Sequence, residues 1–282
     1  MPIKTRLFST SKQVLAEILG SREVSPGHYR LTLSNAEIAT NAQAGHFVHV
    51  LPRQTHSFDP FLRRAFSIVS RREDTFDILF RVSGKGTKAM SQWSPGEIID
   101  LLGPLGKTFA PLGTSSLLIG GGVGTPPMAM LASQRSESDV QSITALIGAR
   151  TKAEVLCEED FARYNVEMEI ATDDGSKGHH GLVTELLENH LQSVKSHAAP
   201  PRVYACGPLP MLRAVAEVCE RYQAPCQISL EENMPCGVGV CNGCVIPVIN
   251  SGDDYETYRR ICVDGPVAWA HEIQWKHWDV KP

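Results

Sequence analysis

The chain has 282 residues, of which 42% are hydrophobic and 21% are charged, and its formal net charge is −4. These values are ordinary for a globular protein of about two domains, and they exclude a basic tract for nucleic acid. Apolar runs such as residues 116–130 are broken by Gly and Pro and are too short to span a bilayer. The first residues lack the apolar core of a signal peptide, and eight cysteines are too sparse for a disulfide scaffold. We therefore expect a cytoplasmic protein with reduced thiols.

Residues 1–112 are predicted to form an antiparallel β-barrel. Six segments in this region have strand character and are separated by turns that contain Gly and Pro, which is typical of small barrels. The first segment is also compatible with a short helix. The six segments are residues 14–24, 28–34, 46–51, 64–69, 75–82 and 98–102.

Two neighbouring features of this region suit a flavin nucleotide. Arg64-Ala65-Phe66-Ser67 offers a guanidinium for a pyrophosphate, an aromatic ring for the flavin and a hydroxyl for its N5 edge. A charged strand start followed by a core Phe accounts for these residues equally well. The turn at residues 84–87 precedes an expected helix start at Lys88, where free N–H groups would suit a phosphate, although Gly-Thr turns before helices are common.

From residue 113 to 225, strands alternate with helices, which predicts a parallel sheet with crossover connections. Residues 120–127 form a glycine-rich turn of the form G-x-G-x-x-P, which allows a pyrophosphate to approach the start of a helix. Gly122, residues 173–175 and residues 206–208 each follow a strand, and parallel sheets bind ligands at that edge. A nucleotide site is therefore expected there. The expected strands are residues 116–120, 143–149, 166–172 and 202–206, and the expected helices are residues 128–133 and 210–218.

Four cysteines near the C-terminus have the spacing of a metal centre. Cys236, Cys241 and Cys244 follow the pattern C-x4-C-x2-C, and Cys262 comes after a gap of seventeen residues. This is the plant-type spacing of a [2Fe–2S] cluster, and the glycines in the loop would let its N–H groups point at sulfur. A four-thiolate zinc site or unrelated buried thiols remain alternatives, although structural zinc sites usually have a close cysteine pair in both halves.

Several other polar or reactive residues have an ordinary explanation. Residues 158–160 suit the acidic first turn of a helix, and the pair His179-His180 suits a solvated loop. Cys157, Cys219 and Cys226 are expected to be small buried residues. Trp269, Trp275 and Trp278 are expected in a core or contact surface.

The order of these features resembles one family across nearly the whole chain. A barrel with R-x-F-S, a Gly-rich nucleotide turn, Cys-Gly-Pro and a C-terminal cysteine loop is similar to the electron-transfer subunit of the NAD-linked, two-subunit dihydroorotate dehydrogenase (class 1B), in the ferredoxin reductase-like superfamily. The most specific matches are residues 229–236, the three-cysteine loop and residues 260–267. Residues 103–106, 174–176, 178, 181–184 and 204–208 also match.

The resemblance implies an α+β protein of three domains. These are an FAD-binding antiparallel β-barrel (1–112), an NAD-binding α/β domain with a parallel sheet (113–225) and a small [2Fe–2S] domain (226–282). It implies cluster ligation by Cys236, Cys241, Cys244 and Cys262. The FAD contacts that it implies are Arg64, Ala65, Phe66, Ser67, Leu79, Phe80, Arg81, Gly86 and Thr87, and the NAD contacts are Gly122, Gly124, Asp174 and Cys206.

The resemblance also implies a partner, the FMN-containing catalytic subunit of dihydroorotate dehydrogenase, in a heterotetramer with two copies of each chain. Electrons would pass from dihydroorotate through FMN, the cluster and FAD to NAD+, in pyrimidine (UMP) biosynthesis. The chain would then be an oxidoreductase subunit, and the catalytic base for dihydroorotate would lie on the partner.

Two other functions remain open. The flavin subunits of NADH-dependent ferredoxin:NADP oxidoreductases and sulfide dehydrogenases are close relatives, but they have Asp at the position of the first cluster thiolate, where this chain has Cys236. An NAD(P)H-dependent reductase serving a ferredoxin, a sulfide dehydrogenase or an oxygenase is therefore the main alternative. A zinc-stabilised nucleotide-binding regulator is the non-enzymatic one.

Overall fold

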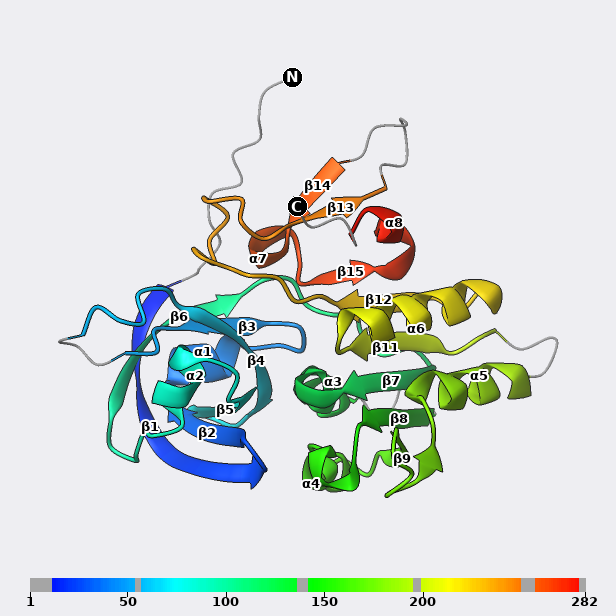
Figure 1. Ribbon diagram of the computed structural model, residues 1–282, viewed down its shortest axis with the longest axis horizontal. Coiled ribbons are helices and arrows are strands. Elements are labelled where there is room, and N and C mark those ends of the chain that lie inside the picture. Colours follow the sequence, from blue (N-terminus) through cyan, green and yellow to red (C-terminus); the bar gives the residue numbers. More distant parts are fainter. Residues whose placement is uncertain (1–11, 54–56, 136–141, 195–198, 250–256, 279–282) are drawn as a thin grey trace.

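A computed structural model describes residues 12–53, 57–135, 142–194, 199–249 and 257–278. Figure 1 shows a barrel on the left, a larger sheet with helices on the right, and the C-terminal segment above both. The α+β class and the barrel-then-sheet order expected from the sequence are confirmed. Among the described residues, no helix is long and apolar enough to cross a membrane.

The barrel consists of six antiparallel strands in the closed order β1-β2-β5-β4-β3-β6. Its first segment is a strand throughout, since Val14 pairs with Leu101 of the last strand. The strands enclose an apolar core that includes Leu31, Leu33 and Ile78. The bounds are β1 (Lys12–Ser25), β2 (His28–Ser34), β3 (Phe47–Val50), β4 (Arg64–Arg71), β5 (Thr75–Arg81) and β6 (Ile98–Leu105), with helices α1 (Ala36–Asn41) and α2 (Lys85–Met90).

Helix α2 begins three residues before the predicted start at Lys88. The reason is that the Thr87 side chain caps the start of the helix, which the sequence pattern of the turn did not indicate. The Thr87 hydroxyl accepts hydrogen bonds from the N–H groups of Ser83 (2.9 Å) and Gly84 (3.2 Å), which anchors the first turn. Gly86 and Thr87 therefore lie inside the helix and not ahead of it.

The second sheet has seven strands in the order β10-β9-β8-β7-β11-β12-β15. Its neighbouring strands are parallel except for β15, which runs antiparallel to β12. The carboxyl ends of the central strands face the barrel, and α3 lies between the sheet and the barrel (Figure 1). The strands are β7 (Ser115–Gly121), β8 (Ser142–Ala149), β9 (Glu167–Thr172), β10 (His179–His180), β11 (Arg202–Cys206), β12 (Cys226–Ser229) and β15 (Val267–Trp269). The helices are α3 (Thr125–Ala132), α4 (Glu158–Arg163), α5 (Val183–Ser193) and α6 (Leu209–Arg221), and the 3-10 turns are η1 (Gly122–Gly124), η2 (Lys152–Glu154) and η3 (Ala270–Glu272).

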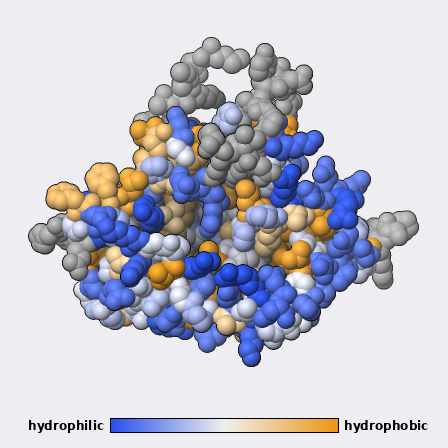
Figure 2. All heavy atoms as spheres, in the orientation of Figure 1, coloured by the Kyte–Doolittle hydropathy of each residue, from blue (hydrophilic) through white to orange (hydrophobic). Residues whose placement is uncertain are grey.

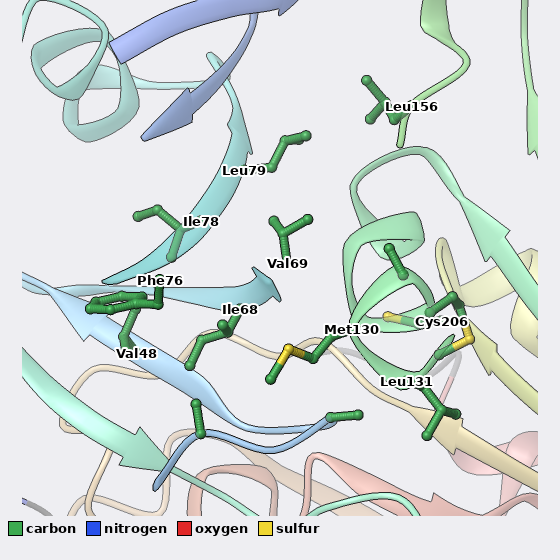
Figure 3. Packing of buried hydrophobic residues seen from close by; sticks show 14 of the residues in the cluster. Val48, Ile68, Val69, Phe76, Ile78, Leu79, Met130, Leu131, Leu156 and Cys206 are labelled. Carbon is green, nitrogen blue, oxygen red and sulfur yellow. The ribbon is translucent and has the colours of Figure 1, made fainter. Parts of the chain in front are cut away.

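Helix α3 joins the two halves of the molecule through apolar packing. Figure 3 shows Met130 of α3 directed toward Ile68 of β4, and all the residues of this helix are buried. A helix that is apolar all round needs neighbours on both sides, and here these are the sheet and the barrel. The packing fixes the position of β4, which begins with Arg64-Ala65-Phe66-Ser67, relative to the glycine-rich turn that precedes α3.

A buried ion network provides a second link between the halves. Arg30 of β2 donates hydrogen bonds to Asp77 of β5 (2.6 Å), to Ser70 of β4 (3.1 Å) and to Asp160 of α4 (2.8 Å). Burial opposes the charge of Arg30, but the hydrogen bonds and charges of Asp160 and Asp77 outweigh it and raise the Arg30 pKa. The predicted acidic first turn at residues 158–160 is confirmed, with Asp160 turned inward.

The C-terminal segment extends the large sheet and also packs on the barrel (Figure 1). Its strands β12 and β15 belong to the large sheet, while β13 (Val245–Val248) and β14 (Thr257–Arg260) form a separate ribbon followed by α7 (Ile261–Asp264) and α8 (Trp275–Trp278). The segment packs tightly on the barrel, since a Cβ at Gly106 would lie 2.5 Å from Pro266 Cδ. The boundaries at residues 112 and 225 remain proposals for the limits of three functional domains.

Candidate functional site

A cleft of about 890 Å³ opens between the barrel and the large sheet. Its walls come from the first half of β4, the end of β5, the start of α2, the β7–α3 turn and residues 229–235. Figure 2 shows the face of the molecule on which polar and apolar side chains of the two halves meet. All the residues for which the family resemblance implies an FAD contact line this one cleft. They are Arg64, Ala65, Phe66, Ser67, Leu79, Phe80, Arg81, Gly86 and Thr87.

The barrel holds the aromatic wall of the cleft in a fixed position. The first residues of β4 are partly exposed, whereas Ile68 and Val69 in its second half are buried in the core. Phe66 packs at a tilt on Phe80 with ring centroids 5.7 Å apart, and Phe80 stacks on Tyr29 at 5.9 Å. Such aromatic contacts restrict the Phe66 ring before any ligand binds.

The phosphate side of the cleft is formed by Arg64 and the first turn of α2. Arg64 Nη1 donates to the carbonyl oxygens of Leu62 (2.9 Å) and Arg63 (3.0 Å), which fixes the arginine at the rim. Gly86 packs closely on Pro52, because a Cβ at Gly86 would lie 3.2 Å from Pro52 Cγ and the proline ring would have to shift by a few tenths of an ångström. The arrangement combines a fixed cation with a close backbone approach, both of which suit a pyrophosphate.

The nucleotide turn after β7 has two glycines with different roles. Gly122 has φ +54°, and no atom lies within 4 Å of the place that a Cβ on it would take, so its surface is open to a ligand. A Cβ at Gly124 would instead lie 2.3 Å from the carbonyl oxygen of Cys206, so Gly124 allows two turns of the sheet edge to pack together. Cys206 and Val123 line the cleft directly. Burial raises the pKa of the Cys206 thiol, with a smaller contribution from Glu231.

Asp174 lies at the same sheet edge but outside the cleft. Its carboxylate accepts hydrogen bonds from Ser176 Oγ (2.6 Å) and Ser176 N (2.9 Å), which lower its pKa. The structure therefore brings Cys206 and the flavin-side residues together but leaves Asp174 on the outer part of the edge.

Several residues that line the cleft were not predicted as site residues, although residues 229–236 match the family closely. They belong to the segment between β12 and the first cluster cysteine, and they include Glu231, Asn233 and Met234. Burial raises the pKa of the Glu231 carboxyl. The acidic run Glu231-Glu232 directly before a cysteine loop was the available signal, but only the fold shows that it faces the cleft.

The four C-terminal cysteines form two pairs in space. The first pair is Cys236 with Cys241, and the second is Cys244 with Cys262, whose N–H group lies 3.5 Å from the Cys244 sulfur. Burial opposes ionisation of Cys236, but N–H groups of Cys241, Val238 and Val240 outweigh it and lower the pKa of this thiol to about 6. Backbone donors directed at sulfur are what a thiolate ligand requires.

Paired thiols fit a two-metal cluster better than one ion. A [2Fe–2S] cluster takes two protein ligands on each iron. Gly237 and Gly239 have φ +71° and φ +77°, backbone conformations that glycine adopts readily and that let the loop turn sharply between the cysteines. The donor set and its pairing therefore fit the cluster.

Gly237→Ala is expected to lower cluster retention by at least about tenfold, as changes around a metal ligand commonly do. A Cβ at this position would lie 2.4 Å from His49 Nδ1, so the loop that carries Cys236 would have to move. Gly27→Ala is the matched control, because Gly27 also has φ +71° but nothing within 4 Å. Iron and acid-labile sulfide per flavin would measure the effect, and equal cluster content in both variants would contradict it.

Comparisons with known proteins agree with this arrangement. Residues 231–274 match the family model described as the iron-sulfur cluster binding domain of dihydroorotate dehydrogenase B, and residues 118–217 match the oxidoreductase NAD-binding domain. A relative from Bacillus caldolyticus, "Dihydroorotate dehydrogenase B (NAD(+)), electron transfer subunit", is 42% identical over 264 residues, which cover 91% of this chain and 96% of the relative. A relative of the same name from Desulforamulus reducens is 37% identical over 94% of this chain and 100% of its own length.

Solved structures with the same fold include related reductases. One from a study of the NADH-dependent reduced ferredoxin-NADP oxidoreductase has a TM-score of 0.79 and 25% identity, and the match covers 93% of this chain and 91% of that one. A ferredoxin NADP+ reductase from Neisseria gonorrhoeae has a TM-score of 0.63 and 18% identity, covering 79% of this chain and 95% of that one, and it shows the fold alone.

Proposed function

Because the chain belongs to the family of dihydroorotate dehydrogenase B (NAD(+)) electron transfer subunits, we propose that it passes electrons from the FMN of a separate catalytic subunit to NAD+ in pyrimidine biosynthesis. The proposal rests on residues 229–236. This segment lines the cleft and ends in Cys236, so a single short stretch of chain connects the flavin side to the cysteine loop.

The residue assignments form part of the proposal. FAD is held by Arg64 at its pyrophosphate and by Phe66 and Ser67 at its ring. Cys236 and Cys241 hold one iron, and Cys244 and Cys262 hold the other. The remaining contacts are Ala65, Leu79, Phe80, Arg81, Gly86 and Thr87 for FAD, and Gly122, Gly124, Asp174 and Cys206 for NAD.

When bound, FAD exchanges electron pairs with NAD, whereas a [2Fe–2S] cluster carries electrons singly. The chain's own residues orient these groups. The Phe66 ring, restrained by Phe80, would pack against the flavin, and the buried side chain of Cys206 would help to exclude water where the nicotinamide binds. Chemistry on dihydroorotate belongs to the catalytic subunit, with two copies of each chain in the complex. A cytoplasmic location agrees with the reduced thiols that the cysteine loop requires.

A reductase that serves a ferredoxin is the alternative, and the similarity to the NADH-dependent reduced ferredoxin-NADP oxidoreductase structure favours it. Cys236 supports the dihydroorotate system, because the first ligand position is a thiol here. The two functions differ in the electron donor. A complex with an FMN-containing dihydroorotate dehydrogenase should reduce NAD+ with dihydroorotate, whereas the alternative requires reduced ferredoxin.

The decisive experiment is an absorption spectrum of anaerobically purified protein, with iron, acid-labile sulfide and flavin counted together. The proposal requires two irons, two sulfides and one FAD per chain, following the composition of the cluster, and bleaching by NADH. NAD+ reduction by dihydroorotate should appear only after the catalytic subunit is added. Zinc without sulfide, or dihydroorotate oxidation by this chain alone, would refute it.

Arg64→Ala is expected to weaken FAD binding by about 10- to 100-fold, as charge-assisted hydrogen bonds to phosphate contribute about 1.5–3 kcal/mol. Arg71→Ala is the control, because Arg71 lies at the other end of β4 and donates to the Ala39 carbonyl oxygen. FAD dissociation followed by flavin fluorescence would measure both variants. Unchanged binding in Arg64→Ala would remove the arginine from the FAD site.

A further inference from the structure

His49 is a buried histidine on the strand between the flavin wall and the cysteine loop. It lies on β3 with none of its surface exposed, opposite Ala65 of β4. Ala65 lines the cleft and belongs to the sequence Arg64-Ala65-Phe66-Ser67. The backbone of β3 at His49 is therefore in direct contact with the strand that faces the flavin.

The imidazole of His49 points away from the barrel core and toward the cysteine loop. Its Nδ1 atom lies 2.4 Å from the position that a Cβ on Gly237 would take, so only glycine fits beside it. Backbone groups of Met234 and Cys236 also lie next to the ring. The ring thus contacts the loop on both sides of the first cluster cysteine.

Both nitrogen atoms of this ring lack an aligned hydrogen bond to any residue that the structure describes. An imidazole ring carries at least one N–H donor in either protonation state. An unsatisfied polar ring is costly in a closed interior, where an apolar side chain would fill the same space. The backbone of Met234 and Cys236 beside the ring supplies the nearest acceptors for this donor.

We propose that His49 is a positioning residue for the iron–sulfur centre, donating a hydrogen bond to the Cys236 end of the loop and holding that end against the flavin-side strand. This rests on the proposed function. Hydrogen bonds around metal ligands and cluster sulfurs set the reduction potential of the centre. His49 therefore tunes the potential of the cluster and fixes its contact with β4, which carries the flavin wall.

The test compares His49→Leu and His49→Gln with His46→Gln in FAD-loaded, cluster-loaded protein. His46 precedes β3 and accepts a hydrogen bond from Gln43 N (3.1 Å), so it is a histidine engaged locally, at the start of the same strand. Flavin, iron and sulfide content are measured first, and a redox titration followed by electron paramagnetic resonance then gives the cluster potential. Wild-type protein without a [2Fe–2S] cluster would refute the proposed function itself, before any variant is considered.

His49→Leu is expected to keep FAD and to shift the electron equilibrium between flavin and cluster by about tenfold, which is about 59 mV for a one-electron couple. His49→Gln retains an N–H donor and should lie closer to wild type, while His46→Gln should not differ from it. A full cluster at an unchanged potential in His49→Leu would overturn the proposal. If His49→Leu loses the cluster, the cluster content of His49→Gln decides the question. A cluster retained in His49→Gln would support the hydrogen bond. A cluster lost in His49→Gln would show that only the shape of the ring matters and would overturn the proposal.

Discussion

Cys241→Ser is expected to give a protein that binds FAD and is reduced by NADH but passes electrons to its catalytic partner at least about 100-fold more slowly. This magnitude follows because changes outside the ligand set alone cost about 10- to 100-fold, and Cys241 is proposed as a ligand. Cys241 is also an exposed residue of the loop, so its replacement by serine should leave the fold intact. Stopped-flow reduction by NADH and NAD+ reduction by the assembled complex would separate the two steps.

Cys157→Ser provides the matched control for this variant. Cys157 precedes α4, on the other half of the molecule, and burial raises the pKa of its thiol. A thiol of this kind is a packing residue and not a ligand. It should therefore retain cluster, flavin and transfer rate. If Cys241→Ser transferred electrons as fast as Cys157→Ser, electrons would not pass through the cysteine loop.

The barrel and the parallel sheet were predictable because local patterns determine them. Alternating residues define the barrel strands, and the alternation of strand with helix defines the sheet. Helix α5 was missed, although its buried residues Leu187 and Leu191 follow the helical repeat. The entry of β12 and β15 into the large sheet was not predictable, since β12 pairs with a strand nearly forty residues later in the chain. No local pattern specifies such a pairing.

The residues of the candidate site also fall into those that local sequence patterns predicted and those that only the fold revealed. The cysteine spacing and the Arg64–Ser67 sequence were sufficient to nominate residues, and the fold places the flavin candidates on one cleft. The sequence did not reveal the contact between His49 and Gly237, because these residues are far apart in the chain and His49 belongs to no distinctive motif. It also gave no sign that Asp160 would be buried against Arg30, 130 residues away. Contacts between domains depend on docking, which propensity and periodicity do not describe.

Arg30→Gln is expected to lower the free energy of unfolding by about 3–5 kcal/mol, the usual cost of breaking a buried ion pair from one side. The variant leaves Asp77 buried without a cation and leaves Asp160 with only the longer contact to Arg163 at 3.9 Å, and the two carboxylate side chains are only 12% and 2% exposed. Denaturant unfolding of the FAD-loaded protein would measure the loss. Glu159→Gln is the control, because it removes a charge from the next position of α4, where Glu159 pairs with Arg22 at 3.7 Å on the surface.

A second substitution, Asp160→Asn, distinguishes the ion network from a simple loss of packing, because its effect on the free energy of unfolding should change direction when Arg30 is absent. In the native protein Asp160→Asn removes an acceptor from Arg30 and should lower stability. In the Arg30→Gln background the same change removes a buried carboxylate whose remaining cation, Arg163, is 3.9 Å away, and it should raise stability. Residues in one network are expected to be non-additive in this way, and additive losses would contradict the network. Since Asp160 lies on α4 and Asp77 in the barrel, the sign reversal would measure how strongly the two halves, and therefore the two walls of the cleft, are held together.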